Sequence, residues 1–489
     1  MRIYSFIRKG LELIPIEVEI SLMAGTNQLQ IMGLPDMAIK ESALRIKSAL
    51  KSQGFRWPAG QQILVNLRPS HWRKSSRGLE LAIACGYLWQ SAQAQVPEEL
   101  TEEAYVYGEL SLNGQVHIPD DLNSLFNHPE QKPILTGYSP RPHNHPLLSI
   151  KSLAQVNLPS PILPRTLPEE LLEDVPLPDL NFPKSAARLL AVVASGEHST
   201  LLAGPAGSGK TTLAKALHSL LGKPGPQLQR EIQRVRRWFN EDFLSRPLVC
   251  PHHSVTTMSM CGGGYPVFPG EITRAHGGLL VLDEFLEFNN QVKEALREPL
   301  ESGEIVISRR GHTQVLPARF LLLASTNLCH CGRLVPNKNV NCRFSLTKCR
   351  SYLERLSGPL LDRFDVLAFS NGWVNSKKMM FSETEAVHLS TIKELVDKTR
   401  KFQKSRSQDS HPSPNGRTDG ETISKTLDKF TRENLLPATG GSQRRFRALM
   451  RVARTLADLD QSSKITPKHI DEASDWAWQN FEQLHRIFA

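Results

Sequence analysis

Residues 204–211 follow the pattern Gly-x-x-x-x-Gly-Lys-Ser/Thr, which is typical of a loop that binds the phosphates of a nucleotide. Glycines in such a loop lack a Cβ, so successive backbone N–H groups can turn toward phosphate oxygens. A lysine brings positive charge to the β- and γ-phosphates, and the next hydroxyl can bind Mg²⁺. The pattern predicts that ATP is bound by Gly204, Pro205, Gly207, Ser208, Gly209, Lys210, Thr211 and Thr212.

Two carboxylates, Asp283 and Glu284, follow the apolar run at residues 279–282. A buried parallel strand would carry both carboxylates to its carboxyl end, beside the phosphate loop. We expect Asp283 to hold Mg²⁺ together with Thr211. Glu284 is then placed to orient and polarise the water that attacks the γ-phosphate.

Two further polar residues, Asn327 and Arg363, complete the candidate catalytic set. Asn327 follows the apolar run at residues 320–324 and is expected to position the attacking water. Arg363 follows a Ser-Gly-Pro turn and is flanked by Asp362 and Asp365. It could reach outward to stabilise charge on ATP held by a neighbouring subunit, or pair locally with one of these carboxylates.

The elements that must position these groups form an α/β core over residues 184–375. Apolar runs at 191–194 and 199–203 predict the buried strand before the phosphate loop. Residues 211–221 have the spacing of a helix whose N-terminus faces the phosphates.

A separate α/β domain is predicted over residues 1–158, where strand-like and helix-like patterns alternate. Asn113 and Gly114 are typical of a hairpin turn. The expected elements are strands at 13–22, 29–35 and 63–67, helices at 38–53 and 79–88, and a hairpin at 105–116.

The remaining segments differ in composition. Residues 159–183 are rich in proline and acidic residues, which predicts an interdomain linker. Within residues 376–489, helical patterns at 443–460 and 467–483 predict a small α domain. The polar stretch 401–422 predicts a mobile insertion in it.

The composition is that of a basic, multidomain protein without a membrane-spanning segment. The 489 residues exceed what one core accommodates, and the 59 Lys+Arg against 49 Asp+Glu give a net charge of +10. That excess favours nucleic acid as a partner over a membrane surface. The absence of a long apolar run or a signal-peptide pattern, with an odd number of cysteines, predicts a cytoplasmic location. A basic loop, either solvated or in contact with nucleic acid, contains Arg68, His71, Arg73, Lys74 and Arg77.

Short blocks in the core lie at residues 251–254, 269–272, 282–285, 295–301, 317–320 and 357–365. In this order they resemble the magnesium-chelatase-like AAA+ ATPases, most closely the bacterial competence branch of ComM (YifB-type) proteins. Blocks at 33–35, 65–67 and 108–114 resemble the first domain of that branch, and 442–444 with 452–458 resemble its lid. The resemblance implies an N-terminal ribosomal-S5/Lon-protease-like α/β domain, a central AAA+ P-loop domain and a small C-terminal α-helical lid.

The function implied by this resemblance is that of a homo-hexameric ring that uses ATP and Mg²⁺ to move along DNA. In the competence branch this motion is branch migration on single-stranded and branched DNA during natural transformation. Arg363 matches the arginine that acts on a neighbour's ATP, and Arg444 matches the lid arginine that senses the γ-phosphate. Two insertions of the clade that face the pore match residues 256–276 and 305–317. The second contains Arg309, Arg310 and His312, which either contact the DNA backbone or form a solvated turn.

Four cysteines follow the Asn327 strand and have the spacing of soft metal ligands. They are Cys329, Cys331, Cys342 and Cys349, with His330 as a possible substitute. They predict either a tetrahedral zinc site or reduced thiols without metal, and the sequence leaves both open.

Three rival functions share parts of these patterns. A metal-chelatase subunit would share the ATPase blocks and the lid but normally lacks the first domain. An ATP-dependent protease would need a Ser–Lys pair, and no serine motif of that class surrounds Ser70, Lys74 or Ser75. An ATP-dependent protein remodeller is the rival that the sequence excludes least.

Overall fold

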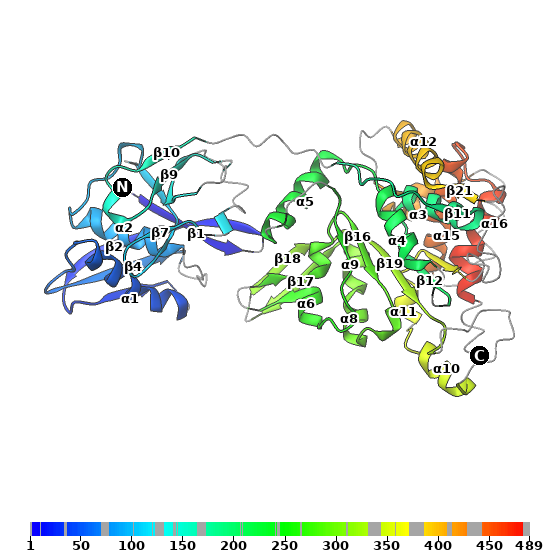
Figure 1. The fold of residues 1–489 in the computed structure, drawn as a ribbon, viewed down its shortest axis with the longest axis horizontal. Coiled ribbons are helices and arrows are strands. Elements are labelled where there is room, and N and C mark those ends of the chain that lie inside the picture. Colours follow the sequence, from blue (N-terminus) through cyan, green and yellow to red (C-terminus); the bar gives the residue numbers. More distant parts are fainter. Residues whose placement is uncertain are drawn as a thin grey trace. The chain divides into compact units, whose positions relative to one another are not determined.

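The computed structural model divides into two compact units, residues 1–170 with 236–242, and residues 171–235 with 243–489. Figure 1 shows the elements of each unit. The residues that the structure describes are 2–9, 11–33, 37–69, 78–100, 102–119, 121–122, 132–139, 143, 145–163, 173–205, 207, 209–239, 241, 245–264, 267–309, 312–330, 344–356, 358–370, 386–407, 413–427 and 443–482.

The first unit contains an eight-stranded mixed sheet of order β10-β9-β8-β5-β1-β2-β4-β3. Its strands are β1 (Arg2–Lys9), β2 (Glu12–Ala24), β3 (Leu29–Met32), β4 (Gln61–Arg68), β5 (Glu103–Val106), β8 (Ile134–Gly137), β9 (Leu147–Ile150) and β10 (Ser160–Ile162). The helices α1 (Met37–Ser52) and α2 (Leu79–Gln90) share its core, and α2 packs on β1 and β2. The predicted hairpin is formed by β6 (Glu109–Leu110) and β7 (Val116–His117).

Helix α2 is buried around nearly its whole circumference and carries one buried carboxylate, Glu80. Its oxygens accept hydrogen bonds from the Ser42 hydroxyl at 2.6 Å and from the Leu110 N–H at 2.9 Å. Arg45 pairs with the same side chain. A buried carboxylate is tolerated because such partners replace its water, so Glu80 joins α1, α2 and β6.

The second unit is built on a five-stranded parallel sheet of order β13-β16-β19-β12-β20. Its strands are β12 (Thr200–Ala203), β13 (Leu248–Val249), β16 (Leu279–Leu282), β19 (Leu321–Thr326) and β20 (Val366–Phe369). Every residue of β12, β16 and β19 is buried, as expected for a parallel sheet covered on both faces. Since the strands are parallel, the segments that follow β12, β16 and β19 lie at one edge of the sheet.

Helices from both ends of the second unit share one core with this sheet. They are α3 (Lys184–Gly196), α4 (Lys210–Leu220), α12 (Leu389–Ser407), α15 (Gln443–Leu459) and α16 (Pro467–Ser474). The short strands β11 (Asn181–Pro183) and β21 (Ala386–His388) pair antiparallel. The other helices are α5 (Pro226–Trp238), α6 (Thr257–Cys261), α7 (Glu271–Arg274), α8 (Asn290–Ala295), α9 (Arg297–Ser302), α10 (Leu346–Leu353), α11 (Gly358–Leu361) and α13 (Gly420–Ser424).

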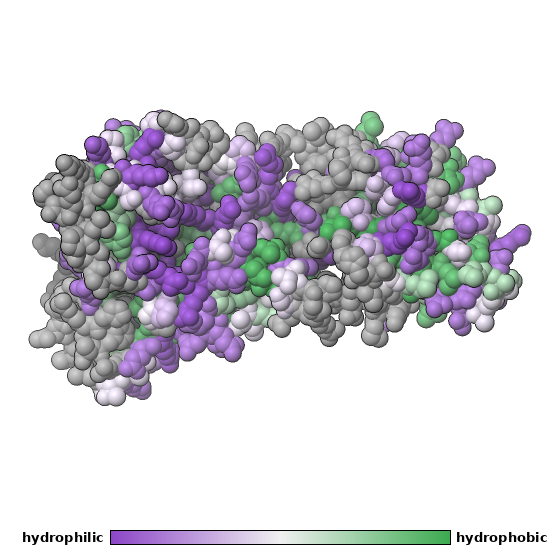
Figure 2. All heavy atoms as spheres, turned by 180° about the vertical axis from the view of Figure 1, so that it is seen from behind, coloured by the Kyte–Doolittle hydropathy of each residue, from purple (hydrophilic) through white to green (hydrophobic). Residues whose placement is uncertain are grey.

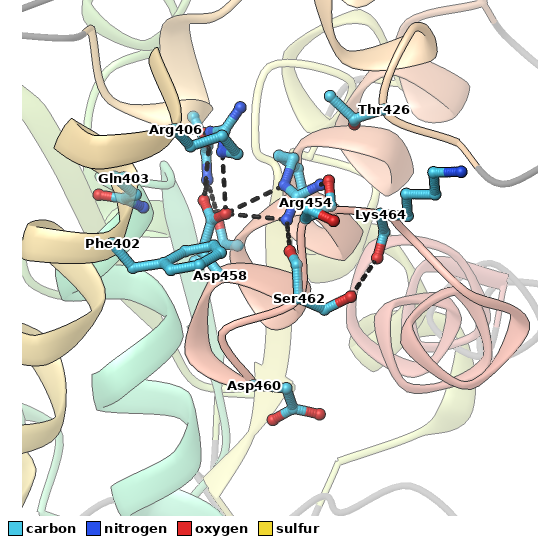
Figure 3. A network of polar contacts seen from close by, with 12 residues as sticks. Phe402, Gln403, Arg406, Thr426, Arg454, Asp458, Asp460, Ser462 and Lys464 are labelled. Carbon is cyan, nitrogen blue, oxygen red and sulfur yellow. Dashed lines mark hydrogen bonds and ion pairs between the residues drawn. The ribbon is translucent and has the colours of Figure 1, made fainter. Parts of the chain in front are cut away.

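A network of buried ion pairs holds the C-terminal helices together (Figure 3). Asp458 is fully buried on α15 and pairs with Arg454 at 2.9 Å, also fully buried, and with Arg406 of α12 at 3.2 Å. Asn415 donates to the same carboxylate at 2.7 Å. Because both oxygens have cationic or amide partners, this buried charge is compensated and ties three segments to one point.

Three sequence predictions are corrected in this unit. Residues 191–194 lie in helix α3, not in a strand, because a short apolar run is compatible with a buried helix as well as a strand. Residues 401–407 continue α12, and Asn415 is 3% exposed, so these parts of the predicted mobile insertion belong to the folded core. Two ends of the predicted linker are strands, β10 and β11.

Two antiparallel hairpins occupy the predicted insertions. The first pairs β14 (Gly262–Gly263) with β15 (Phe268–Pro269). The second pairs β17 (Glu304–Arg309) with β18 (His312–Pro317), and Arg309 lies opposite His312 in the last pair.

Among the described residues, no helix has the length and apolar character needed to cross a bilayer. Figure 2 shows hydrophilic and hydrophobic residues interspersed over the coloured part of one face.

Candidate active site

A cavity of about 390 Å³ lies at the carboxyl ends of β12, β16 and β19. The structure thus brings together three segments that the sequence singled out. Its lining residues are Gly207, Gly209, Lys210, Thr211, Thr212, Asp283, Glu284, Ser325, Thr326 and Asn327.

The phosphate loop has the backbone that its glycines predict. Gly207 and Gly209 have φ angles of +76° and +83°, which side chains with a Cβ rarely adopt. A Cβ on either would meet no atom within 4 Å, so the requirement for glycine is the backbone angle and the space above the loop is open. Gly209 is the N-cap of α4, and the partial positive charge at the N-terminus of a helix attracts phosphate. Ser208 lies outside the described residues.

The Lys210 ammonium is held above this loop by three oxygens. Its Nζ donates to the carbonyls of Gly204 and Pro205, both at 3.0 Å, and to Oδ1 of Asn327 at 3.3 Å. Burial lowers the pKa of Lys210, while the nearby Asp283 and Glu284 oppose that shift. A phosphate oxygen could therefore replace the loop carbonyls as the acceptor of the hydrogen bonds that the ammonium donates.

The two carboxylates differ in how they are held. Asp283 accepts hydrogen bonds from the Ser325 hydroxyl and from the N–H of Glu284, the latter at 3.1 Å. Glu284 has a left-handed backbone, φ +53°, and its side chain is 57% exposed. A non-glycine residue in this conformation is strained, and such strain concentrates at functional sites. Nδ1 of His253 lies 3.7 Å from Glu284 Oε2.

Sequence reasoning assigned no role to Ser325 or His253. Both stood in segments that were already singled out, the strand before Asn327 and the block at 251–254. Their partners are 42 and 31 residues away in the chain, so local spacing contains no signal for either contact.

The residues present fit ATP with Mg²⁺. The loop offers open space at the N-terminus of α4, Lys210 offers a cation, and Thr211 with Asp283 offers hard oxygen ligands within the same cavity. Asp283 accepts hydrogen bonds from the Ser325 hydroxyl and the Glu284 N–H, and these two bonds fix the orientation of a carboxylate that could bind the metal.

Arg363 and Arg444 lie together at a different place, on the carboxylate of Glu301. Arg363 Nη2 donates to Glu301 Oε2 at 2.9 Å, and Arg444 Nη2 donates to Oε1 at 3.3 Å. Neither arginine lines the cavity of its own chain as described above. The two carboxylates that flank Arg363 have other partners: Asp362 pairs with Arg445 at 3.3 Å and Asp365 with His198 at 3.4 Å.

Comparison with known proteins identifies the family. The family model for subunit ChlI of Mg-chelatase matches residues 17–132, that for magnesium chelatase, subunit ChlI, matches 177–376, and its C-terminal model matches 388–476. A protein named YifB from Escherichia coli strain K12 is 32% identical over 95% of this chain and 94% of its own length. The chain belongs to the magnesium-chelatase ChlI-like family.

Two other relatives differ in how much of the chain they cover. Competence protein ComM of Haemophilus influenzae is 31% identical over 96% of both chains. A DNA replication licensing factor of Schizosaccharomyces pombe is 24% identical over 42% of this chain and 26% of its own length. The ATPase domain of the family spans residues 177–376 and thus the whole cavity, which implies ATP hydrolysis with ATP and Mg²⁺.

The cysteines of this ChlI-like chain show no metal cluster where the structure describes them. Cys329 and Cys349 are buried, whereas Cys331 and Cys342 lie outside the described residues. The His330 ring lies 4.1 Å from the Tyr352 ring. Within the described ranges no three His, Cys, Asp or Glu residues come together as metal ligands, so zinc stays a prediction without support.

The predicted DNA-contacting residues stand at the end of the second hairpin. Arg309 and His312 form the last residue pair of β17 and β18, and Arg310 lies outside the described residues. The basic loop of the first domain, from His71 to Arg77, also lies outside them.

Proposed function

We propose that this ChlI-like ATPase is a homo-hexameric motor that moves along DNA and drives branch migration of recombination intermediates in natural transformation. The ribosomal-S5/Lon-protease-like topology of the first domain is part of the same proposal. The observation that carries it is the arginine pair: Arg363 and Arg444 are held on Glu301 and do not line the cavity of their own chain.

The arginine pair supports a ring because a lone subunit has no use for it in hydrolysis. Hydrolysis places extra negative charge on the phosphate oxygens, and a positioned arginine stabilises that charge. The side chains of Glu301 and Arg444 are 57% and 45% exposed, whereas that of Arg363 is 12% exposed. A phosphate of ATP in an adjacent subunit could replace Glu301 as their partner, which would couple hydrolysis to subunit contact.

The residues of the cavity divide the chemical work. Lys210 and the loop N–H groups bind and orient the phosphates, and Thr211 with Asp283 would hold Mg²⁺. Mg²⁺ supplies positive charge that neutralises the phosphate oxygens. Glu284 accepts a proton from the attacking water, and its exposure to the cavity leaves an oxygen free to do so. The Asn327 amide, held by Lys210, orients the same water.

Three observations favour DNA as the partner. One full-length relative is a competence protein, and a probable DNA helicase of Oryza sativa is 26% identical over 30% of this chain and 20% of its own. The net charge is +10. The hairpin of β17 and β18 ends in Arg309 and His312, with Arg310 between them in the sequence, and cations on a narrow hairpin can follow a phosphate backbone.

The test compares the ATPase rate without DNA, with single-stranded, duplex and branched DNA, and the migration of a synthetic four-way junction. Arg309→Ala with Arg310→Ala should lower DNA-stimulated hydrolysis and junction migration while the basal rate is retained. The matched control, Lys401→Ala with Arg447→Ala, removes two exposed charges from α12 and α15 and should behave like the parent.

Two results would redirect the proposal. If the hairpin variant moves the junction as well as the parent, the hairpin is a solvated turn. If no DNA stimulates the parent at low salt, the motor on DNA is excluded. The protein-remodelling or chelatase-type function would then take its place, to be tested with unfolded protein substrates or tetrapyrrole metal insertion.

A further inference from the structure

A second cavity, of about 660 Å³, lies in the same unit at the opposite edge of the parallel sheet. Ser199 and Phe320 line it, and they directly precede β12 and β19. The ATP cavity lies where these two strands end, so the sheet separates the two cavities. The other walls come from α3, α5, α9, α12 and α15, from the loop after α4 and from the turn that carries Gly416 and Arg417.

The charge of this cavity is strongly positive. Seven basic side chains line it, against three glutamates, Glu197, Glu231 and Glu301. The basic residues are Lys223, Arg246, Arg319, Arg400, Lys404, Arg417 and Arg451.

Each glutamate has a basic partner, which either lines the cavity itself or lies outside it. Glu197 accepts from Arg246 at 2.8 Å, and Glu231 lies 3.0 Å from the buried His276. Glu301 holds the pair Arg363 and Arg444. Glu197 also favours the charged forms of Arg400 and Arg417, so its one negative charge is shared among three arginines. Seven cations against three carboxylates leave an excess of four positive charges in the lining.

Arg400 is the most confined of the remaining cations. Its Nη2 donates to the Ala194 carbonyl at 3.0 Å, while Nη1 is buried and has no hydrogen-bond partner among the described residues. Asp397 lies 3.9 Å from Nη1 and is bound by Lys393 at 2.9 Å. Burial lowers the pKa of Arg400 although Glu197 opposes the shift, so its cation is held without full solvation. An anion in the cavity would supply the missing partner.

Arg417 and Lys404 line the same space. Desolvation lowers the pKa of Arg417, Glu197 opposes that shift, and the nearby Arg246 and Arg319 add to it. Repulsion among these cations costs folding energy unless a bound anion offsets it.

The wall that carries these cations is rigidly positioned. Gln403 of α12 donates to the Ser195 carbonyl at 3.3 Å, and Arg406, one turn further along the helix, pairs with Asp458 (Figure 3). Asn415 joins the same carboxylate from the turn that carries Arg417. Arg400, Lys404 and Arg417 are thus presented from segments fixed to α15, which is a requirement for a specific site.

We propose that this cavity binds a small ligand that carries a diphosphate or triphosphate group. A guanidinium group can donate two hydrogen bonds to one phosphate, and the excess of cations over carboxylates in the lining suits the charge of two to three phosphates. The volume falls within the range of about 300–1,000 Å³ found for small-molecule sites. Leu228, Leu300 and Phe320 provide an apolar part of the wall for the remainder of such a ligand.

The test uses the full chain with Lys210→Ala, which removes phosphate binding at the other cavity, and isothermal calorimetry with inorganic tripolyphosphate and with ATP. We expect one remaining site for tripolyphosphate. Adding Arg417→Gln and Lys404→Gln should raise its Kd by about tenfold or more, because each removes one charge-assisted contact. The matched control adds Lys401→Gln and Arg447→Gln, exposed residues on α12 and α15 that do not line the cavity, and should leave Kd unchanged.

Arg319→Gln is a second variant at an exposed side chain and should weaken binding as well. The ATP arm distinguishes sources: ATP that binds and displaces tripolyphosphate identifies a nucleotide, whereas tripolyphosphate alone identifies a free oligophosphate. The proposal is overturned if the Lys210→Ala protein binds no tripolyphosphate, or binds it equally with and without the cavity substitutions. The proposal is also overturned if tripolyphosphate does not bind but a single-stranded oligonucleotide does, and if that binding requires Arg417 and Lys404. The cavity would then be part of a DNA-binding surface.

Discussion

The Ser325 hydroxyl donates a hydrogen bond to the carboxylate of Asp283, from the end of one strand to the end of its parallel neighbour. In the register of β16 and β19, Leu282 lies opposite Ala324, so the next residue of each strand is also adjacent. This cross-strand bond sets the orientation of the carboxylate that is expected to hold Mg²⁺.

Ser325→Ala should therefore raise the Mg²⁺ concentration needed for half-maximal ATPase activity by roughly tenfold, the value of one hydrogen bond to a charged group. Ser325→Thr keeps the hydroxyl and should restore the parental Mg²⁺ requirement. A Mg²⁺ titration of the steady-state rate measures both. An unchanged requirement in the alanine variant would mean that Asp283 is oriented by the Glu284 N–H alone.

Lys210→Ala should abolish ATP binding, because it removes the cation that the loop carbonyls and Asn327 hold above the phosphate site. Glu284→Gln should bind ATP normally but not hydrolyse it, since an amide cannot accept the proton of the attacking water. Nucleotide binding and single-turnover hydrolysis separate the two effects. Normal turnover by the Glu284 variant would remove it from the catalytic set.

Arg363→Ala and Arg444→Ala should each lower turnover, Arg363→Ala by about 100-fold or more, with ATP affinity nearly retained. Mixing the Arg363→Ala chain with the Lys210→Ala chain should restore part of the activity, because some interfaces then contain one intact cavity and one intact arginine. Arg447→Ala, an exposed arginine on the same helix as Arg444, is the control and should be neutral. If mixed rings form but regain no ATPase activity, Arg363 acts on the ATP of its own subunit.

The lowered pKa of His276 predicts that the folded protein loses stability at acid pH. Burial lowers its pKa below the ordinary 6.5, Glu231 opposes this shift, and Arg417 and Arg319 reinforce it. The unfolded chain takes up a proton near pH 6.5 and the folded chain does not, so the stabilisation is fully present above that pH and is lost as the pH falls. Between about pH 7.5 and 5.5 the melting temperature should fall less in His276→Gln than in the parent.

Glutamine is chosen because it preserves both hydrogen bonds of the ring. His276 Nδ1 accepts from the Arg319 N–H at 3.0 Å, and its other nitrogen lies 3.0 Å from Glu231. An amide can do both without titrating. His253→Gln, at a partly exposed site, serves as the control. Equal pH slopes in all three proteins would show that His276 does not govern acid stability.

Asp458→Ala should lower the free energy of unfolding by about 3–5 kcal/mol, because it leaves the buried Arg454 and the partly buried Arg406 without their counter-charge. Asp460→Ala is the matched control on the turn that follows α15 (Figure 3). Asp460 is 33% exposed and lies 3.4–3.8 Å from Arg188, Lys468 and His469, and each of these partly exposed pairs should contribute only about 0–1 kcal/mol. Denaturant unfolding followed by circular dichroism measures both, and similar losses would contradict the special role of the buried pair.

The phosphate loop and the ends of β16 and β19 were predictable because their chemistry is local. The loop is defined by glycines and a lysine within eight consecutive residues, and each strand by an uninterrupted apolar run that ends in polar side chains. The hairpin of β17 and β18 was predictable for the same reason, since its two strands are adjacent in the chain.

Local patterning was insufficient where two conformations share one pattern. Residues 191–194 are apolar and buried in α3 as they would be in a strand, and only packing beside α12 and α15 decides for the helix. The polar residues 401–407 predicted an insertion, yet the inner side of α12 buries Gln403 against Ser195.

The sequence by itself determined the family and the chemistry of the ATP cavity, since both depend on residue types at short spacing. Only the tertiary structure decided which residues far apart in the sequence form ion pairs. Glu301 is 62 residues from Arg363 and 143 from Arg444, and no spacing rule connects them. The second cavity likewise collects cations from separate segments of the chain. Such neighbours are set by how helices pack on the sheet, which depends on the shapes of all buried side chains together and not on any one stretch of sequence.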